Sequence, residues 1–328
     1  MTSLRAGLVG IGSMGRHHAR VLRSLDGVDL VGVVDPEGDR HHAAGDAKIL
    51  DEVADLISLG VDYVTIAVPT AFHEGVALAL AEAGVHALVE KPLAFDVESS
   101  TRIADAFESA GLVGGVGHIE RYNPAVQSLR TRLENGDLGD VYQIVTRRQG
   151  PFPNRIADVG VVKDLATHDI DLAAWVTKSH YTSVAAQTAQ QSCREHEDLI
   201  AITGRFASGA IANHLVNWLS PMKERVTVVT GERGAFVADT LAADLTFFAN
   251  GTIATTWDAI AGFRGVSEGD MIRYAIPKVE PLLAEHLAFR DAVRGEESTI
   301  VTMRQGLETV RVAVAALESA NTGETICL

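Results

Sequence analysis

The sequence predicts an α/β protein with two domains, and three observations lead to this fold class. The chain has 328 residues, which is more than one domain usually holds. Over the first third, short apolar runs alternate with segments of helix-like spacing, which is typical of βαβ units and a parallel sheet. Farther along, strand-like runs follow one another with few helices between them, which predicts an α+β domain with a large open, mostly antiparallel sheet.

In the first domain the apolar runs predict buried strands, and the segments between them predict helices. The expected strands are Ala6–Val9, Leu30–Asp35, Tyr63–Val68, His86–Glu90 and Leu112–His118, and the expected helices are Met14–Leu25, Glu74–Ala83 and Val97–Ala110. Asp96 stands where a helix N-cap belongs, and Gly84 and Gly111 stand where helix C-caps belong.

The second domain is expected to begin after Ile119, which divides the chain into domains of residues 1–119 and 120–328. Asn123 and Pro124 predict the N-cap and the first residue of a helix that ends near Gly136. The strands expected after it are Val141–Arg148, Thr182–Gln190, Leu199–Phe206, Ala210–Trp218, Arg225–Thr230 and Leu245–Phe248. Hairpin turns are expected at 207–209 and at Asn250-Gly251. The helices expected at the end of the chain are Leu282–Arg294 and Met303–Ser319.

The composition argues against several classes of function. With 28 basic and 43 acidic residues the net charge is −15, which repels a polyphosphate backbone, so nucleic acid is not an expected partner. No apolar run reaches the ~18 residues that span a bilayer, and the first residues lack the pattern of a signal peptide, so the expected compartment is the cytoplasm. Cys193 and Cys327 lie far apart, and no metal-ligand spacing occurs, so no metal site is expected.

A glycine-rich turn, Gly10-Ile11-Gly12-Ser13-Met14-Gly15, follows the first apolar run and opens the first helix. In this context a G-x-G-x-x-G pattern predicts a dinucleotide-binding Rossmann domain. Gly10 permits the tight turn, Gly12 lets the backbone approach a pyrophosphate, and Gly15 lets helix and strand pack closely. Asp35 ends the second strand, where its carboxylate suits ribose hydroxyls. Because this carboxylate also repels a 2′-phosphate, the expected cofactor is NAD rather than NADP.

Two more loops are expected at the cofactor, because ligands of an open α/β sheet bind beyond the carboxyl ends of its strands. Pro69, Thr70 and His73 follow the third long apolar run, although a surface position at a helix start suits His73 equally well. Glu90 and Lys91 end the next strand at the same edge, so we expect Lys91 on the nicotinamide side. By itself, this segment fits an ordinary Lys-Pro turn better.

A carboxylate and a histidine are expected to share one face of a helix in the second domain. Asp164 and His168 are four residues apart within an apolar spacing that predicts the helix. A carboxylate beside an imidazole suits removal of a proton from an alcohol, since histidine titrates near neutrality. Asp171 is a further candidate for this face, whereas Asp169 is not. An exposed helix face with a capping aspartate explains the pair equally well.

Together these motifs resemble the glucose–fructose oxidoreductase/inositol dehydrogenase (Gfo/Idh/MocA) family. The resemblance covers nearly the whole chain and includes Val68-Pro69-Thr70, Arg121-Tyr122-Asn123-Pro124 at the domain junction, and the ending SANTGE. It implies oxidation of a sugar, cyclitol or related hydroxyl by a nicotinamide cofactor, with Lys91, Asp164 and His168 as the catalytic trio. It also implies a homodimer or homotetramer formed through the C-terminal sheet, and substrate contacts from Arg121, Tyr122 and Asn123.

The expected reaction is hydride transfer from a carbinol carbon to nicotinamide C4, while the alcohol loses its proton. His168 is the expected general base, and Asp164 orients it or holds a neighbouring substrate hydroxyl. Lys91 then stabilises the negative charge that develops on the oxygen. Lys91 is also the alternative base.

Arginines cluster in the segment Arg147-Arg148-Gln149-Gly150-Pro151-Phe152-Pro153-Asn154-Arg155, just before the catalytic helix. Guanidinium groups bind phosphates bidentately, and the segment resembles that of UDP-N-acetylglucosamine 3-dehydrogenases and related nucleotide-sugar enzymes. We therefore expect a nucleotide sugar as substrate, contacted by Arg148 or Arg155, with Arg121 as a further candidate. A basic edge strand that limits aggregation is the alternative explanation.

Three competing functions stay open at this point. One is an inositol or free-sugar dehydrogenase, and another is a glycosidase that uses tightly held NAD for a transient oxidation. Net production of NADH separates a dehydrogenase from such a glycosidase. The third is a non-enzymatic NAD-binding regulator, against which the intact Lys91, Asp164 and His168 argue.

Overall fold

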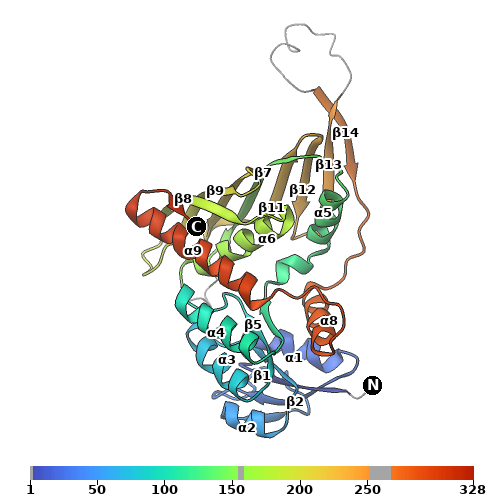
Figure 1. The fold of residues 1–328 in the computed structure, drawn as a ribbon, viewed down its shortest axis with the longest axis vertical. Coiled ribbons are helices and arrows are strands. Elements are labelled where there is room, and N and C mark those ends of the chain that lie inside the picture. The colour runs from blue at the N-terminus through green and yellow to red at the C-terminus, as the bar shows by residue number, and fades with distance from the viewer. Residues whose placement is uncertain (1–2, 154–158, 252–266) are drawn as a thin grey trace. The chain divides into compact units, whose positions relative to one another are not determined.

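The computed structural model describes residues 3–153, 159–251 and 267–328, and these form two compact units (Figure 1). The first unit contains the chain up to Ile119 together with Glu280–Val314. The second contains Glu120–Pro153, Gly160–Val279 and Ala315–Leu328. The first unit therefore differs from the expected domain 1–119, because it includes a segment from near the end of the chain.

The first unit is built on six parallel strands in the order β3-β2-β1-β4-β5-β6. The strands are β1 (Leu4–Val9), β2 (Val28–Val34), β3 (Lys48–Leu50), β4 (Tyr63–Ile66), β5 (His86–Glu90) and β6 (Gly114–Gly117). The helices between them are α1 (Gly15–Ser24), α2 (Val53–Ser58), α3 (His73–Glu82) and α4 (Val97–Ser109). The predicted parallel α/β arrangement is confirmed. Three short elements escaped prediction among the described residues of this unit: β3, α2 and the 3-10 helix Thr70–Phe72. Three to six residues are too few to show a period.

The helix ends in this unit follow from local chemistry. Asp96 caps α4, since one of its carboxylate oxygens accepts the N–H of Ser99 at 2.7 Å. Gly84 and Gly111 follow α3 and α4 with φ angles of +72° and +65°, the left-handed region that favours glycine. The three predicted caps are therefore confirmed.

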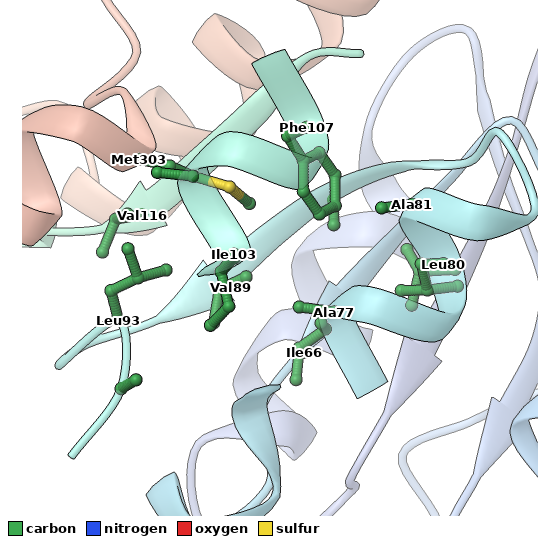
Figure 2. Packing of buried hydrophobic residues seen from close by; sticks show 14 of the residues in the cluster. Ile66, Ala77, Leu80, Ala81, Val89, Leu93, Ile103, Phe107, Val116 and Met303 are labelled. Carbon is green, nitrogen blue, oxygen red and sulfur yellow. The ribbon is translucent and has the colours of Figure 1, made fainter. Parts of the chain in front are cut away.

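Two helices from the end of the chain complete the core of the first unit. These are α8 (Pro281–Val293) and the beginning of α9 (Met303–Thr322). Phe289 on α8 is fully buried and packs edge-on against Tyr63, with ring centroids 5.4 Å apart. Met303 lies in the buried cluster that contains Phe107 and Val116 (Figure 2). Without these helices, apolar side chains on the parallel sheet would be exposed.

The second unit contains a nine-stranded sheet in the order β14-β13-β12-β11-β7-β10-β9-β8-β15. The strands are β7 (Val141–Pro151), β8 (Tyr181–Ala189), β9 (Leu199–Phe206), β10 (Ile211–Asn217), β11 (Leu219–Gly231), β12 (Gly234–Asp239), β13 (Asp244–Gly251), β14 (Ser267–Arg273) and β15 (Ile326–Cys327). Among the described strands of this sheet, the β7–β10 pair is the only parallel one, so the predicted open, mostly antiparallel sheet is confirmed. The turn expected at Asn250-Gly251 is wrong, because both residues pair with β14.

In the described part of the chain, helices cover one face of this sheet, and side chains on the other face, here called the open face, are exposed. Helices α5 (Pro124–Glu134) and α6 (Thr167–Thr177) contact strands β7, β10, β12 and β13. Along β9 the burial alternates, so that Ile200, Ile202 and Phe206 are buried whereas Ala201 and Thr203 are exposed. A sheet covered on one face shows this alternation. In the described parts of the chain, no helix is long and apolar enough to cross a membrane.

Candidate active site

The glycine loop between β1 and α1 has the shape that a dinucleotide requires. Gly10 has a φ of +89°, and a Cβ added there would lie 2.7 Å from the carbonyl oxygen of Ala67. A Cβ on Gly15 would lie 2.0 Å from the carbonyl oxygen of Gly10, so only glycine fits both positions. Around Gly12, by contrast, no described atom lies within 4 Å of the Cβ position. This open space beside the N-terminus of α1 fits the diphosphate of NAD.

Asp35 is held in place by the backbone on both sides of it. Its Oδ2 accepts the N–H of Ile11 in the glycine loop at 2.8 Å, and its Oδ1 accepts the N–H of Glu37 at 2.9 Å. Each carboxylate oxygen has two acceptor positions, so acceptor capacity is left for the two ribose hydroxyls. The residues present therefore fit the adenosine ribose as well as the diphosphate.

His73 is a buried link between two loops. It is 1% exposed, with Nδ1 2.9 Å from the carbonyl oxygen of Pro92 and Nε2 3.0 Å from that of Val68. Burial lowers the pKa of His73 and outweighs these backbone contacts, so the ring is neutral and donates to one carbonyl at a time. The surface position that the sequence allowed is wrong. Both ring nitrogens face carbonyls, so His73 links the loops after β4 and β5, and its contact with the cofactor stays a prediction. Pro69 and Thr70 stand at the start of the first of these loops.

Glu90 and Lys91 end β5 at the carboxyl edge of the parallel sheet. The Glu90 side chain turns inward, where Oε1 lies 2.8 Å from Nε2 of His18 and Oε2 accepts the N–H of Lys91 at 3.1 Å. Glu90 is thus engaged inside the unit, which argues against a direct contact of its carboxylate with the cofactor. Lys91 is half-buried and begins the loop at this edge, where ligands of parallel sheets bind.

Asp164 and His168 lie at the start of the helix that the sequence predicted in the second unit. That helix opens with a π-helical turn, Val162–Ala166, and continues as α6. Asp164 is inside the π-turn and 5% exposed, and His168 follows in the first turn of α6 and is half-buried. The π-turn was not predicted from the spacing; such turns occur frequently at functional sites.

Two of the arginines that the sequence singled out are engaged in buried ion pairs. Arg148 is 3% exposed, and its guanidinium donates to Asp169 at 3.0 Å and to Glu120 at 2.9 Å. Arg121 binds both carboxylate oxygens of Asp171 at 2.6 and 2.8 Å. These pairs argue against the expectation that Arg148 or Arg121 binds a substrate phosphate, because a phosphate would compete with buried carboxylates for the guanidinium groups. Arg155 lies outside the described residues.

The neighbouring junction residues are also engaged inside the second unit. Asn123 caps α5 through the N–H of Ala125 at 3.1 Å, while its amide nitrogen donates to the carbonyl oxygen of Thr240 at 3.0 Å. Tyr122 is 7% exposed. The predicted cap at Asn123 is confirmed, and its amide is used by the fold rather than open to a substrate. Among the described residues, no group of three or more His, Cys, Asp or Glu side chains could hold a metal ion.

Arg225 is a cation of this region that the sequence analysis missed. It lies on β11 in register with Arg148 on β7, and its Nη1 is 3.4 Å from Oε1 of Glu120. Its side chain is 33% exposed, against 4% for Arg148. Burial would raise the pKa of Glu120, but the charge and hydrogen bond of Arg148 hold it below its usual value, so Glu120 is ionised. The sequence placed Arg225 in a strand without showing which strand it neighbours.

Two family models match the chain, one over residues 4–118 (Oxidoreductase family, NAD-binding Rossmann fold) and one over residues 126–237 (GFO/IDH/MocA C-terminal domain). UDP-N-acetylglucosamine 3-dehydrogenase of Acidithiobacillus ferrooxidans is 30% identical over 65% of this chain and 66% of its own length. Its solved structure matches 98% of this chain and 99% of its own, with a TM-score of 0.85 and 25% identity.

Two further relatives differ in their ligands. Inositol 2-dehydrogenase of Corynebacterium glutamicum is 31% identical over 60% of this chain and 61% of its own length. The WlbA dehydrogenase of Bordetella pertussis, solved with NADH and UDP-GlcNAcA, is 25% identical over 99% of both chains, with a TM-score of 0.80. The alignments thus span about two thirds of the curated relatives. Together with the glycine loop and the sheet topology, they show that the chain belongs to the Gfo/Idh/MocA family of oxidoreductases, with an NAD-binding Rossmann fold.

Proposed function

We propose that the protein is an NAD-dependent dehydrogenase that oxidises a hydroxyl of a nucleotide sugar such as UDP-N-acetylglucosamine. The glycine loop carries this proposal, because its geometry fits the NAD diphosphate and Asp35 is fixed where the ribose would bind. Lys91 begins a loop at the carboxyl edge of the same parallel sheet, which is the edge used by ligands.

We assign the catalytic roles to Lys91, Asp164 and His168. Bound NAD supplies the acceptor for the hydride that leaves the carbinol carbon. His168 takes the alcohol proton, and Asp164 orients the imidazole or holds a neighbouring hydroxyl of the substrate. The Lys91 ammonium stabilises the charge that develops on the substrate oxygen. Alternatively, Lys91 is the base. The variants below test whether Lys91 takes part in the reaction or has only a structural role.

The relatives support a nucleotide sugar, and Arg225 offers a group that could recognise it. The Arg225 side chain is 33% exposed and bonds Glu120 at 3.4 Å, so its guanidinium has donors left for a phosphate. Arg155 stays a second candidate from the sequence. The inositol dehydrogenase relative supports a second function, oxidation of inositol, which requires no phosphate contact.

We also propose that the protein assembles as a homodimer or homotetramer through the open face of the nine-stranded sheet. Ile211 and Leu215 on β10 are 38% and 39% exposed and point to this face. Polar side chains beside them already bond across strands, as when Gln143 donates to Asn213 at 2.7 Å and Asn213 to Thr203 at 3.1 Å. These bonds satisfy polar groups that burial in an interface would otherwise leave unpaired.

The first prediction concerns the substrate. With NAD, we expect UDP-N-acetylglucosamine to give net NADH and myo-inositol to give little. Arg225→Ala should lower kcat/KM for the UDP-sugar about 10- to 100-fold, the equivalent of one charged hydrogen bond. Its matched control is Arg147→Ala, whose side chain is 53% exposed and pairs with Glu224. Good turnover of myo-inositol with none of UDP-N-acetylglucosamine would establish the second function instead.

The second prediction concerns the catalytic trio. Lys91→Ala and His168→Ala should each lower kcat roughly 100- to 10,000-fold, the usual range for acid–base groups. NADH affinity, measured by fluorescence titration, should stay within a few-fold, because the diphosphate and ribose contacts lie elsewhere. Lys178→Ala, whose side chain is 57% exposed, serves as the control. Near-normal turnover in either variant would remove that residue from the mechanism.

The third prediction concerns cofactor choice. Asp35→Ser should shift the ratio of kcat/KM for NAD to that for NADP by roughly 10-fold or more toward NADP. The variant removes both a charged ribose contact and the repulsion of a 2′-phosphate. Glu37→Ser is the control, since the Glu37 side chain is 62% exposed and nearby. A wild type that already prefers NADP would contradict the role of Asp35.

The fourth prediction concerns assembly. Leu215→Arg should convert the assembly to monomers, as measured by light scattering after gel filtration, because it places a charge in the apolar part of the open face. Phe72→Arg, at an exposed position of the first unit (61% exposed), should leave the mass unchanged. A monomeric wild-type protein would rule out assembly through this face.

A further inference from the structure

Four titratable side chains gather inside the first unit, and the chemistry proposed above uses none of them. We name them the His–Glu cluster: His18 on α1, Glu90 at the end of β5, and Glu285 and His286 on α8. His18 and His286 are 0% exposed and Glu285 is 1% exposed. The side chain of Glu90 is 13% exposed. Burying such groups is costly unless they are paired or neutral, so each of the four must be hydrogen-bonded or uncharged.

The two carboxyl groups of the cluster carry different charges. Burial, and then the nearby charge of Glu90, raises the pKa of Glu285 well above its usual value, so the site favours the neutral form of Glu285. Burial also acts to raise the pKa of Glu90, but the hydrogen bond and charge of His18, with the charge of Lys91, hold it below its usual value. Two carboxyl groups at one site cannot both ionise easily, and here Glu90 carries the charge.

A chain of hydrogen bonds runs from α8 through α1 to the Lys91 amide. Nε2 of His286 lies 2.8 Å from Nδ1 of His18, and Nε2 of His18 lies 2.8 Å from Oε1 of Glu90. A carboxylate only accepts, so His18 donates to Glu90. The second oxygen, Oε2, accepts the N–H of Lys91 at 3.1 Å. The Glu90 carboxylate therefore joins the backbone of Lys91 to a fixed imidazole.

We propose that His18, Glu90 and His286 are positioning residues that hold Lys91 in its reactive place and link it to the helix that follows the glycine loop. The inference rests on the proposed function, in which Lys91 acts on the reacting oxygen. His18 lies on α1, whose first residue is Gly15, so one helix carries both the end of the glycine loop and the imidazole that fixes Glu90. The cluster thereby places the lysine relative to the bound cofactor within a single unit.

The role of charge can be separated from the role of shape by two isosteric variants. Glu90→Gln keeps the volume but replaces one acceptor with an N–H₂ donor, which faces either the N–H of His18 or that of Lys91. We expect kcat to fall by up to about 100-fold, since a misplacement of about 1 Å near the chemistry has that effect. Glu285→Gln resembles the neutral acid already present, so its kcat should stay within about twofold of wild type.

The histidine is tested by loss and rescue. His18→Leu removes both hydrogen bonds, whereas His18→Gln keeps an amide N–H near the position of Nε2. We expect His18→Leu to lower kcat as Glu90→Gln does and His18→Gln to recover a large part of it. In these variants KM for NAD and the number of NADH-binding sites should equal those of the wild type. A variant that is merely misfolded would lose NADH-binding sites. The kinetic assay uses UDP-N-acetylglucosamine or myo-inositol, whichever the wild type oxidises. A second measurement needs no substrate: amide hydrogen exchange of residues 86–93 should be faster in Glu90→Gln than in the wild type.

Lys91→Ala, measured in parallel, separates the two levels of the argument. If Lys91→Ala is inactive while Glu90→Gln keeps normal kcat and normal exchange, the positioning role is overturned and the proposed function stands. If Lys91→Ala is fully active, the catalytic assignment fails and the positioning role fails with it. Equal losses in Glu285→Gln and Glu90→Gln would also overturn the inference, because packing rather than charge would then be responsible. Should His18→Leu fail to fold, the two isosteric variants still decide the question.

Discussion

A buried carboxylate must be paired or protonated, and this constraint organises the polar interior of both units. In the first unit Glu90 stays ionised because His18 and the Lys91 amide bind it, while its neighbour Glu285 is neutral. In the second unit Glu120 stays ionised because Arg148 and Arg225 face it. Both carboxylates lie next to residues that we assign to chemistry or to substrate recognition. The same physical requirement therefore supports the scaffold and orients the groups that act on the substrate.

The constraint also explains why an arginine can be prominent in the sequence and still be closed to a ligand. Removing one partner of a buried ion pair costs about 3–5 kcal/mol. A single charged hydrogen bond to a phosphate contributes only about 1.5–3 kcal/mol, so it does not offset that cost. Arg148 has two buried carboxylate partners, so a phosphate would have to displace interactions that the fold needs. Arg225, on the neighbouring strand, bonds Glu120 at the longer distance of 3.4 Å and keeps a third of its side chain exposed. Of the two, Arg225 has the more exposed side chain and the longer bond to Glu120.

Features that depend on local spacing could be predicted from the sequence, and features that depend on distant partners could not. The glycine loop, the caps at Asp96 and Asn123 and the strand β5 each follow from a few adjacent residues, and each is confirmed. The inward turn of Glu90 depends on a residue 72 positions away in sequence, and the pairs of Arg148 depend on residues 28 and 21 positions away. The helical spacing of α8 likewise shows an apolar face but not which sheet that face covers. The π-turn at Asp164 was missed because it covers only five residues, too few to change the helical spacing of the sequence.

The return of α8 and the start of α9 to the first unit makes that domain discontinuous in the chain. During synthesis the parallel sheet emerges early, but Phe289 and Met303 reach it only after nearly all of the second unit has been made. Domains normally fold as units as they leave the ribosome. Here part of the apolar surface of the first unit stays uncovered until α8 and the start of α9 have been synthesised. In a fragment that ends at Ile119, that surface would stay exposed. A recombinant that takes only residues up to Ile119 from a relative would join this domain to an α8 and an α9 that come from a different protein.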